Sequence, residues 1–179
     1  MRIKAEDTFA IVIDYQEKIL PAMSGQEELL RKSQILLGGL KALEVPMILT
    51  TQYAKGLGNN IPAITDAMGV TEAIDKNTFS VYDNESVRRA IPHGKKNVIL
   101  CGIEAHICVL QSLMDLQAAG YQTILVADCV ASRSDRDLEF AYERAKQEGA
   151  IITSAEAILY ELAGSSKHPA FKTISALVK

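Results

Sequence analysis

The chain has 179 residues, of which 48% are hydrophobic, enough for one sizeable core and too few for two ordinary domains. Its formal net charge of −3 offers no basic surface for nucleic acid, and no apolar run approaches the roughly 18 residues of a membrane span. Residues 1–7 lack the apolar core of a signal peptide, and three cysteines without a CxxC pair are typical of a reducing compartment. We therefore expect one domain over residues 1–179, in the cytoplasm, with no nucleic-acid or membrane partner.

Strand and helix patterns alternate along the chain. Short apolar runs predict strands at 9–14, 45–51, 97–101, 123–127 and 150–153, with a shorter extended piece at 74–76. Apolar residues at helical spacing predict helices at 26–43, 86–90, 108–119 and 135–148, followed by two C-terminal helices. Glycine, asparagine and proline punctuate residues 53–69, which we interpret as a loop. The alternation predicts a three-layer αβα, Rossmann-like domain.

Cys108 stands in the first turn of the helix that follows the predicted strand 97–101. A helix N-terminus presents unpaired backbone N–H groups and the positive end of a dipole. That position favours thiolate over thiol and can bind an oxyanion. We therefore expect Cys108 to act as a nucleophile.

Two further chemically useful residues end predicted strands. Asp14 closes the first strand, and Lys76 closes the short extended piece at 74–76. Ligands of open parallel sheets bind beyond the carboxyl ends of the strands, where Asp14, Lys76 and Cys108 would converge. A carboxylate that takes the thiol proton, an ammonium beside it and helix-start amides suffice for acyl transfer.

Five segments carry a resemblance to a known family, and they lie at residues 11–16, 50–53, 75–80, 101–109 and 127–133. In this order and spacing they resemble the isochorismatase-like cysteine hydrolases, which include nicotinamidases, N-carbamoylsarcosine amidohydrolases and isochorismatase. The resemblance covers nearly the whole chain. Residues 52–58 are similar to small members known only as isochorismatase domain-containing proteins.

The resemblance implies a fold and a site. It implies a mainly parallel six-stranded sheet of order 3-2-1-4-5-6 and a homo-oligomer. It also implies a catalytic triad of Asp14, Lys76 and Cys108, a cis peptide between Ile103 and Glu104, and an oxyanion hole made by the amides of Glu104 and Cys108. We accordingly expect Asp14 and Lys76 within hydrogen-bond reach, with the Cys108 sulfur close to Asp14.

The sequence departs from the nicotinamidases of this family at their metal site. Their Asp-x-His motif falls where this chain has Gln52-Tyr53-Ala54, and the three histidines lack ligand spacing. We expect no metal and no cofactor, and a substrate other than nicotinamide. Isochorismatase proper cleaves a vinyl ether and generally lacks the cysteine, so Cys108 favours a small amide, carbamoyl or ester substrate.

Other polar and aromatic residues are candidates for the substrate pocket: Gln16, Gln52, Tyr53, Phe79 and His106. His106 is two residues from Cys108 on the helix, so its ring should point away from the sulfur. The role of Arg133 stays open between substrate binding, subunit contact and helix capping. Cys101 and Cys129 are interpreted as small buried hydrophobic residues.

Two classes of function remain. The first is a cysteine-dependent hydrolase that forms a Cys108 acyl-enzyme on a small-molecule substrate. The alternatives are a catalytically idle oligomeric binding or scaffold protein, or an isochorismatase-type vinyl ether hydrolase. The complete triad favours the first.

Overall fold

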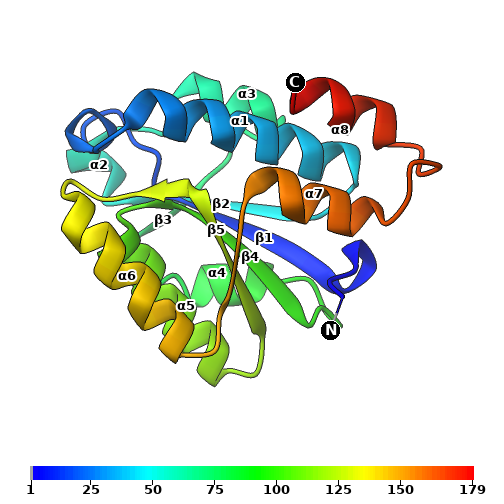
Figure 1. The fold of residues 1–179 in the computed structure, drawn as a ribbon. Helices are drawn as coiled ribbons and strands as arrows, with labels where there is room; N and C mark the ends of the chain where they lie inside the picture. Colours follow the sequence, from blue (N-terminus) through cyan, green and yellow to red (C-terminus); the bar gives the residue numbers. More distant parts are fainter. Residues whose placement is uncertain (1) are drawn as a thin grey trace.

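A parallel six-stranded sheet runs through residues 2–179, the part of the chain that the computed structural model describes (Figure 1). The strands are β1 (Thr8–Ile13), β2 (Met47–Gln52), β3 (Ile74–Lys76), β4 (Asn97–Ile103), β5 (Gln122–Ala131) and β6 (Ile151–Thr153). Their order in the sheet is β3-β2-β1-β4-β5-β6, and each neighbouring pair is parallel. The predicted strand order is confirmed.

Helices cover both faces of the sheet. They are α1 (Gln26–Ala42), α2 (Ala54–Leu57), α3 (Pro62–Met68), α4 (Glu85–Ala90), α5 (Leu110–Ala118), α6 (Asp135–Gln147), α7 (Ala155–Ala163) and α8 (Phe171–Leu177). Three short helical turns accompany them: η1 (Ala5–Asp7), η2 (Leu20–Ala22) and η3 (Ala105–Val109). Figure 1 shows α1, α3, α7 and α8 on one side of the sheet and α4, α5 and α6 on the other. The three-layer prediction is confirmed.

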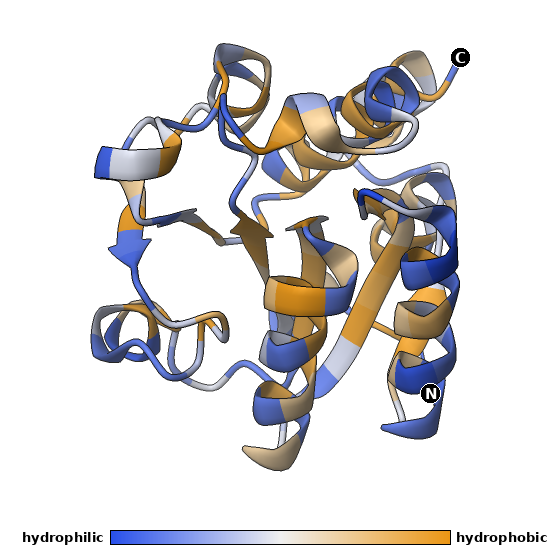
Figure 2. Ribbon diagram, turned by 90° about the vertical axis from the view of Figure 1, so that its left-hand side faces the viewer, coloured by the Kyte–Doolittle hydropathy of each residue, from blue (hydrophilic) through white to orange (hydrophobic). Residues whose placement is uncertain are grey.

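The central strands are buried on both faces, which is why their sequences are apolar without alternation. All six residues of β1 and all seven of β4 are buried. Side chains that alternate along β1 enter two separate cores, because successive residues of a strand point to opposite faces. Figure 2 shows the hydrophobic colour concentrated in the central strands and on the helix surfaces that face them.

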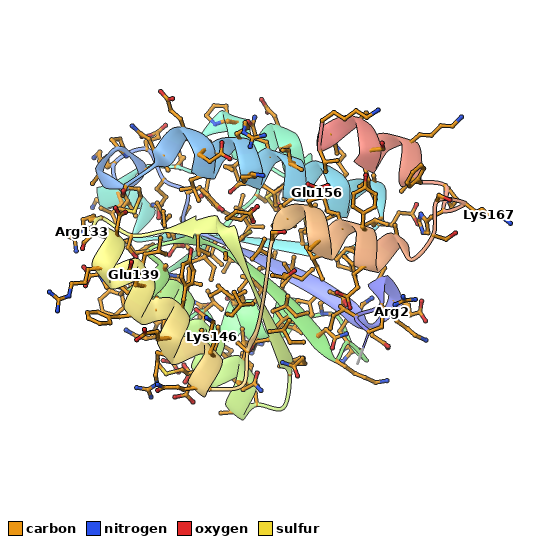
Figure 3. All side chains as sticks on the ribbon, in the orientation of Figure 1. Arg2, Arg133, Glu139, Lys146, Glu156 and Lys167 are labelled. Carbon is orange, nitrogen blue, oxygen red and sulfur yellow. The ribbon has the colours of Figure 1, made fainter. Side chains whose placement is uncertain are left out.

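The surface helix α6 is buried on one side only. Its small residues Ala141 and Ala145 are buried, whereas Glu139 and Lys146 are exposed on its outer side (Figure 3). Within residues 2–179, no helix combines the length and the apolar character needed to cross a membrane.

The loop predicted at residues 53–69 is wrong in part, because it contains the short helices α2 and α3. Pro62 occupies the first turn of α3, where its fixed φ suits a helix and no N–H is needed. Gly69 ends α3 in the left-handed region, with φ of 68°. The proline and the glycine that suggest a loop are therefore the start and stop signals of a helix.

Candidate active site

The predicted triad residues meet at the carboxyl edge of the sheet. Asp14 directly follows β1, Lys76 is the last residue of β3, and Cys108 lies in η3 after β4. The chain places β2 and β3 on one side of β1 and then returns to place β4, β5 and β6 on its other side. This reversal of strand order is where parallel α/β sheets place their ligands.

Asp14 and Lys76 form a fully buried ion pair. The distance from Lys76 Nζ to Asp14 Oδ2 is 2.7 Å, and both side chains are 0% exposed. The other carboxylate oxygen accepts a hydrogen bond from the Thr50 hydroxyl at 2.8 Å. Asp14 also has φ of 56°, a left-handed conformation that a non-glycine residue seldom adopts. The expected contact between the two residues is confirmed, and Thr50 is a partner that the sequence motifs did not reveal.

Lys76 has further partners besides Asp14. Its Nζ donates to Gln52 Oε1 at 2.7 Å and to the Thr78 carbonyl at 3.3 Å. Together with Asp14, these acceptors use the three N–H groups of the ammonium. The lysine is therefore held in one position inside the protein.

Cys108 lies beside this pair in the π-helical turn η3 and is 7% exposed. Burial raises the pKa of its thiol from the ordinary value of 9.0 to about 12. The Lys76 charge opposes this rise in pKa, while the charges of Asp14 and Glu104 add to it. The expectation that position favours the thiolate is therefore wrong, because loss of solvation outweighs the effects of the helix start and the lysine.

Opposing effects also act on the pKa of the Asp14 carboxyl. Burial raises its pKa, and the Lys76 charge, hydrogen bonds from Lys76 and Thr50, and the Cys108 thiol lower it. The thiol thus lies close enough to the carboxylate for each group to affect the pKa of the other. Burial prevails over these opposing effects, so the pKa of the Asp14 carboxyl lies above its ordinary value of 3.8.

The backbone before Cys108 has three special features. The peptide bond between Ile103 and Glu104 is cis, as the family resemblance implies. Gly102 has φ of 129°, and a Cβ atom there would lie 2.1 Å from the Ile13 carbonyl oxygen. Within residues 2–179, the N–H of Glu104 has no hydrogen-bond acceptor.

A cavity of about 130 Å³ opens onto the Cys108 thiol. It is lined by Ile19, Gln52, Leu57, Phe79, Ile103, Glu104, Ile107 and Cys108. Gln52 and Phe79, two of the predicted pocket residues, belong to this lining. Ile19 and Leu57 come from segments without a recognisable motif, so sequence reasoning did not find them.

The other three predicted pocket residues do not line this cavity. Gln16 is 0% exposed and uses its amide on backbone groups of Gln52 and Gly58. Tyr53 lies outside on the surface, 51% exposed. The His106 ring contacts the buried Ser132 hydroxyl, with 2.9 Å between Nδ1 and Oγ. The ring therefore packs toward the end of β5.

Arg133 is paired with Glu104 next to the cavity. Its backbone N–H and its Nε both donate to Glu104 Oε2, at 3.2 and 3.0 Å. The Arg133 side chain is 61% exposed, and Figure 3 shows it at the edge of the molecule where β5 leads into α6. The structure shows an internal contact to Glu104, in the turn before Cys108, which is a different role from the three left open for Arg133.

No group of three or more His, Cys, Asp or Glu side chains that could hold a metal ion is found among residues 2–179. At the family's Asp-x-His positions, Gln52 bonds Lys76, and the backbone N–H of Ala54 bonds Asp75 Oδ1 at 2.8 Å.

The fold is a parallel α/β domain with an aspartate, a lysine and a cysteine gathered at the strand ends. The isochorismatase domain family matches residues 8–157, and the chain belongs to this family. It therefore has the fold of the isochorismatase-family hydrolases.

Individual relatives agree with this assignment. The chain is 37% identical over 168 residues to isochorismatase domain-containing protein 1 of Salmo salar, covering 93% of this chain and 59% of that protein. It is 35% identical over 184 residues to the secreted isochorismatase effector Isc1 of Phytophthora sojae, covering 99% of this chain and 87% of that one. The solved structure of the MAR1 ribonuclease from Caenorhabditis elegans superposes with a TM-score of 0.92 at 36% identity, covering 99% of this chain and 92% of that one.

Proposed function

We propose that this protein is a cysteine-dependent hydrolase of a small amide, carbamoyl or ester substrate. The observation that carries the proposal is the buried Asp14–Lys76 pair next to the Cys108 thiol at the end of one cavity. A buried ion pair is expensive to maintain and is retained more readily where it performs chemistry than where it only stabilises the fold.

The first half of the reaction makes an acyl-enzyme. Asp14 accepts the thiol proton while Cys108 Sγ attacks the substrate carbonyl carbon and a C–S bond forms. The charge that develops on the carbonyl oxygen is stabilised by the N–H groups of Glu104 and Cys108, our candidate oxyanion hole. Asp14 then gives the proton to the leaving nitrogen or oxygen as the C–N or C–O bond breaks.

The second half returns the enzyme to its starting state. Asp14 accepts a proton from water, whose oxygen attacks the thioester carbon. The C–S bond breaks, the carboxylic acid leaves, and the sulfur regains the proton from Asp14. Lys76 does not exchange protons in this scheme, and its charge opposes the rise in the Asp14 pKa that burial causes.

The small volume and largely apolar lining of the cavity suit a substrate with a small acyl group. Five of its eight lining side chains are aliphatic or aromatic: Ile19, Leu57, Phe79, Ile103 and Ile107. Such a surface contributes by removing apolar area from water, and the few polar groups fix orientation.

The experiment is a panel of small amides, carbamates and esters, followed by product release and by intact-protein mass. The wild type should hydrolyse at least one of them and show an acyl adduct on the Cys108 peptide. Cys108→Ala should lose at least about a thousandfold in rate. Cys101→Ala removes a buried thiol within β4 and should keep both the activity and the adduct.

Other outcomes would contradict the proposal. Turnover that survives in Cys108→Ala would assign the chemistry to another group, as in a vinyl ether hydrolase. A folded protein that neither turns over nor acylates with any panel member would favour the idle scaffold. Because the Caenorhabditis elegans relative is named a ribonuclease, an RNA oligonucleotide is included, and Cys108-dependent RNA cleavage would also contradict the proposal.

We further propose a homo-oligomer in the cytoplasm. The three cysteines are free and buried, which suits a reducing compartment. Tyr53, Phe79 and Phe140 are each more than half exposed, and exposed aromatic side chains are common at subunit contacts. Light scattering of the purified protein tests the assembly, and a monomeric mass would contradict it.

A further inference from the structure

We infer, on the basis of the proposed nucleophile Cys108, that Gln52 is a specificity-determining residue that covers the Lys76 ammonium and makes the site select an uncharged substrate. The inference concerns which substrates reach Cys108. It deepens the proposed hydrolase function by naming the charge class of its substrate.

The charge of Lys76 acts on the Cys108 thiol, yet the ammonium itself is not accessible from the cavity. Its side chain is 0% exposed, and it does not contribute to the lining of the cavity. Its three N–H groups are directed to Asp14 Oδ2, Gln52 Oε1 and the Thr78 carbonyl. An anionic substrate therefore finds no free N–H on this ammonium.

Gln52 contacts the ammonium and also belongs to the lining of the cavity. Its side chain lines the cavity, while its Oε1 lies 2.7 Å from Lys76 Nζ and its Nε2 donates to the Asn77 carbonyl at 3.1 Å. A substrate in the cavity therefore contacts the neutral amide of Gln52 in place of the charged ammonium of Lys76.

Gln16 fixes Gln52 in this position. The Gln16 amide accepts from the Gln52 backbone N–H at 2.7 Å and donates to the Gln52 carbonyl at 3.0 Å. It also donates to the Gly58 carbonyl at 2.7 Å. Gln16 is fully buried, and this two-point contact continues the pairing of the β1 segment with β2 beyond the Ile13–Thr50 pair. Gln16 is therefore a positioning residue for Gln52.

The remaining charge at the cavity also disfavours anions. Glu104 is the one charged residue in the lining, and its Oε2 is engaged by Arg133. Arg133 itself lies outside the lining with its side chain 61% exposed. A substrate carboxylate in the cavity would face Glu104 and would lose its hydration without gaining a counter-charge.

A matched pair of alkylating reagents tests this without a known substrate. Iodoacetamide is uncharged and iodoacetate is anionic, while both transfer a group of similar size to sulfur with loss of iodide. The rate of Cys108 labelling is followed by mass spectrometry of its peptide. The ratio of the two rates is divided by the same ratio for glutathione, a free thiol in solution. We expect this normalised ratio to favour iodoacetamide by at least about tenfold in the wild-type protein.

Substitutions at Gln52 should move this ratio in opposite directions. Gln52→Ala uncovers the ammonium and should reduce the preference for iodoacetamide about tenfold. Gln52→Glu keeps an acceptor for Lys76 but adds negative charge, and it should increase the preference. The control Phe79→Ala widens the cavity without uncovering Lys76, so both reagents should change alike and the ratio should stay near the wild-type value.

The outcomes separate this inference from the proposed function. A wild-type ratio equal to that of glutathione, or equal ratios in Gln52→Ala and Gln52→Glu, overturns the inference even where hydrolysis is observed. A preference for iodoacetate that disappears in Arg133→Gln would assign anion binding to Arg133 and would also overturn it. The expected ratios in a protein without turnover would leave the inference intact and reject the hydrolase proposal.

Discussion

At the scale of single residues, the site is governed by desolvation. The Cys108 thiol, the Asp14 carboxyl and the Lys76 ammonium are almost entirely buried, and the charge of each affects the pKa of its neighbours. The pKa of the thiol is raised to about 12, so few Cys108 side chains are ionised at neutral pH. Slow labelling of Cys108 at neutral pH is consequently expected of an active site here, and by itself does not indicate an idle one.

Replacing the base should separate labelling from catalysis. In Asp14→Asn the negative charge that raises the Cys108 pKa is lost while Lys76 remains, so the thiol pKa should fall. Labelling by iodoacetamide at mildly alkaline pH should then become faster. Hydrolysis should fall by at least about 100-fold because no group is left to move the proton. Parallel loss of both rates would show that Asp14 only supports the structure.

Removing the Lys76 ammonium should raise the pKa of the Cys108 thiol, the opposite of the effect of Asp14→Asn. Lys76→Met removes the charge that lowers the pKa of both Cys108 and Asp14, so both pKa values should rise. Labelling at a fixed pH should slow, and the pH dependence of labelling should move to higher pH. Lys55→Met is the control, because Lys55 is an exposed lysine on the nearby helix α2 and should leave the profile unchanged. An unchanged profile in Lys76→Met would contradict the assigned role.

At the scale of elements, the close approach of β1 and β4 positions the nucleophile. Gly102 of β4 pairs with Ile13 of β1. Ile13 directly precedes Asp14, and Gly102 lies two residues before the turn that leads to Cys108. Its missing side chain lets the ends of the two strands lie together, and its φ of 129° is open to glycine. This close contact keeps the ends of β1 and β4, which lead to the base and the nucleophile, next to each other.

A pair of glycine substitutions measures this contact. In Gly102→Ala the new Cβ would lie 2.1 Å from the Ile13 carbonyl oxygen, which belongs to the backbone and has no room to move. We expect a loss of at least about 3 kcal/mol in the free energy of unfolding by urea. Gly94 also has positive φ, at 78°, but no atom lies within 4 Å of its Cβ position. Gly94→Ala should therefore cost only about 1 kcal/mol, and equal costs for the two variants would refute the steric explanation.

At the scale of the whole molecule, several buried acids hold their protons in the folded state. Burial raises the pKa of Cys101 to about 12, as it does for Cys108, and raises those of Cys129 and Tyr15 well above their ordinary values. The unfolded chain loses the thiol protons near pH 9, so above that pH it binds fewer protons than the folded state. Stability must therefore fall as pH rises from about 9 toward 12.

Urea unfolding in the presence of a reductant, repeated across this pH range, measures the effect. Each fully buried thiol should contribute a fall of about 1.4 kcal/mol per pH unit. Cys101→Ala should make the dependence on pH less steep by about that amount, whatever its effect on stability at neutral pH. A free energy of unfolding that stays constant above pH 9 would contradict the raised thiol pKa values.

Local features of the sequence are enough to predict the order of the elements and the residues that end the strands. Apolar period, helix-ending glycines and strand-terminal polar residues predict the three-layer fold and bring Asp14 and Lys76 to one edge of the sheet. Their direct contact follows from strand order, which the family resemblance supplies. The helix α3 is missed because its signals, Pro62 and Gly69, also occur in loops.

The protonation of Cys108 and the roles of Gln16 and Gln52 depend instead on tertiary packing. Desolvation depends on side chains that pack around the thiol from distant segments, such as Ile19 and Phe79, and no local pattern records that packing. The position of Gln16, two residues after Asp14, predicts a pocket residue, but the turn after β1 directs its amide to the backbone of Gln52. Residue spacing fixes which groups are available at a strand end, whereas burial and hydrogen-bond partners fix what those groups do.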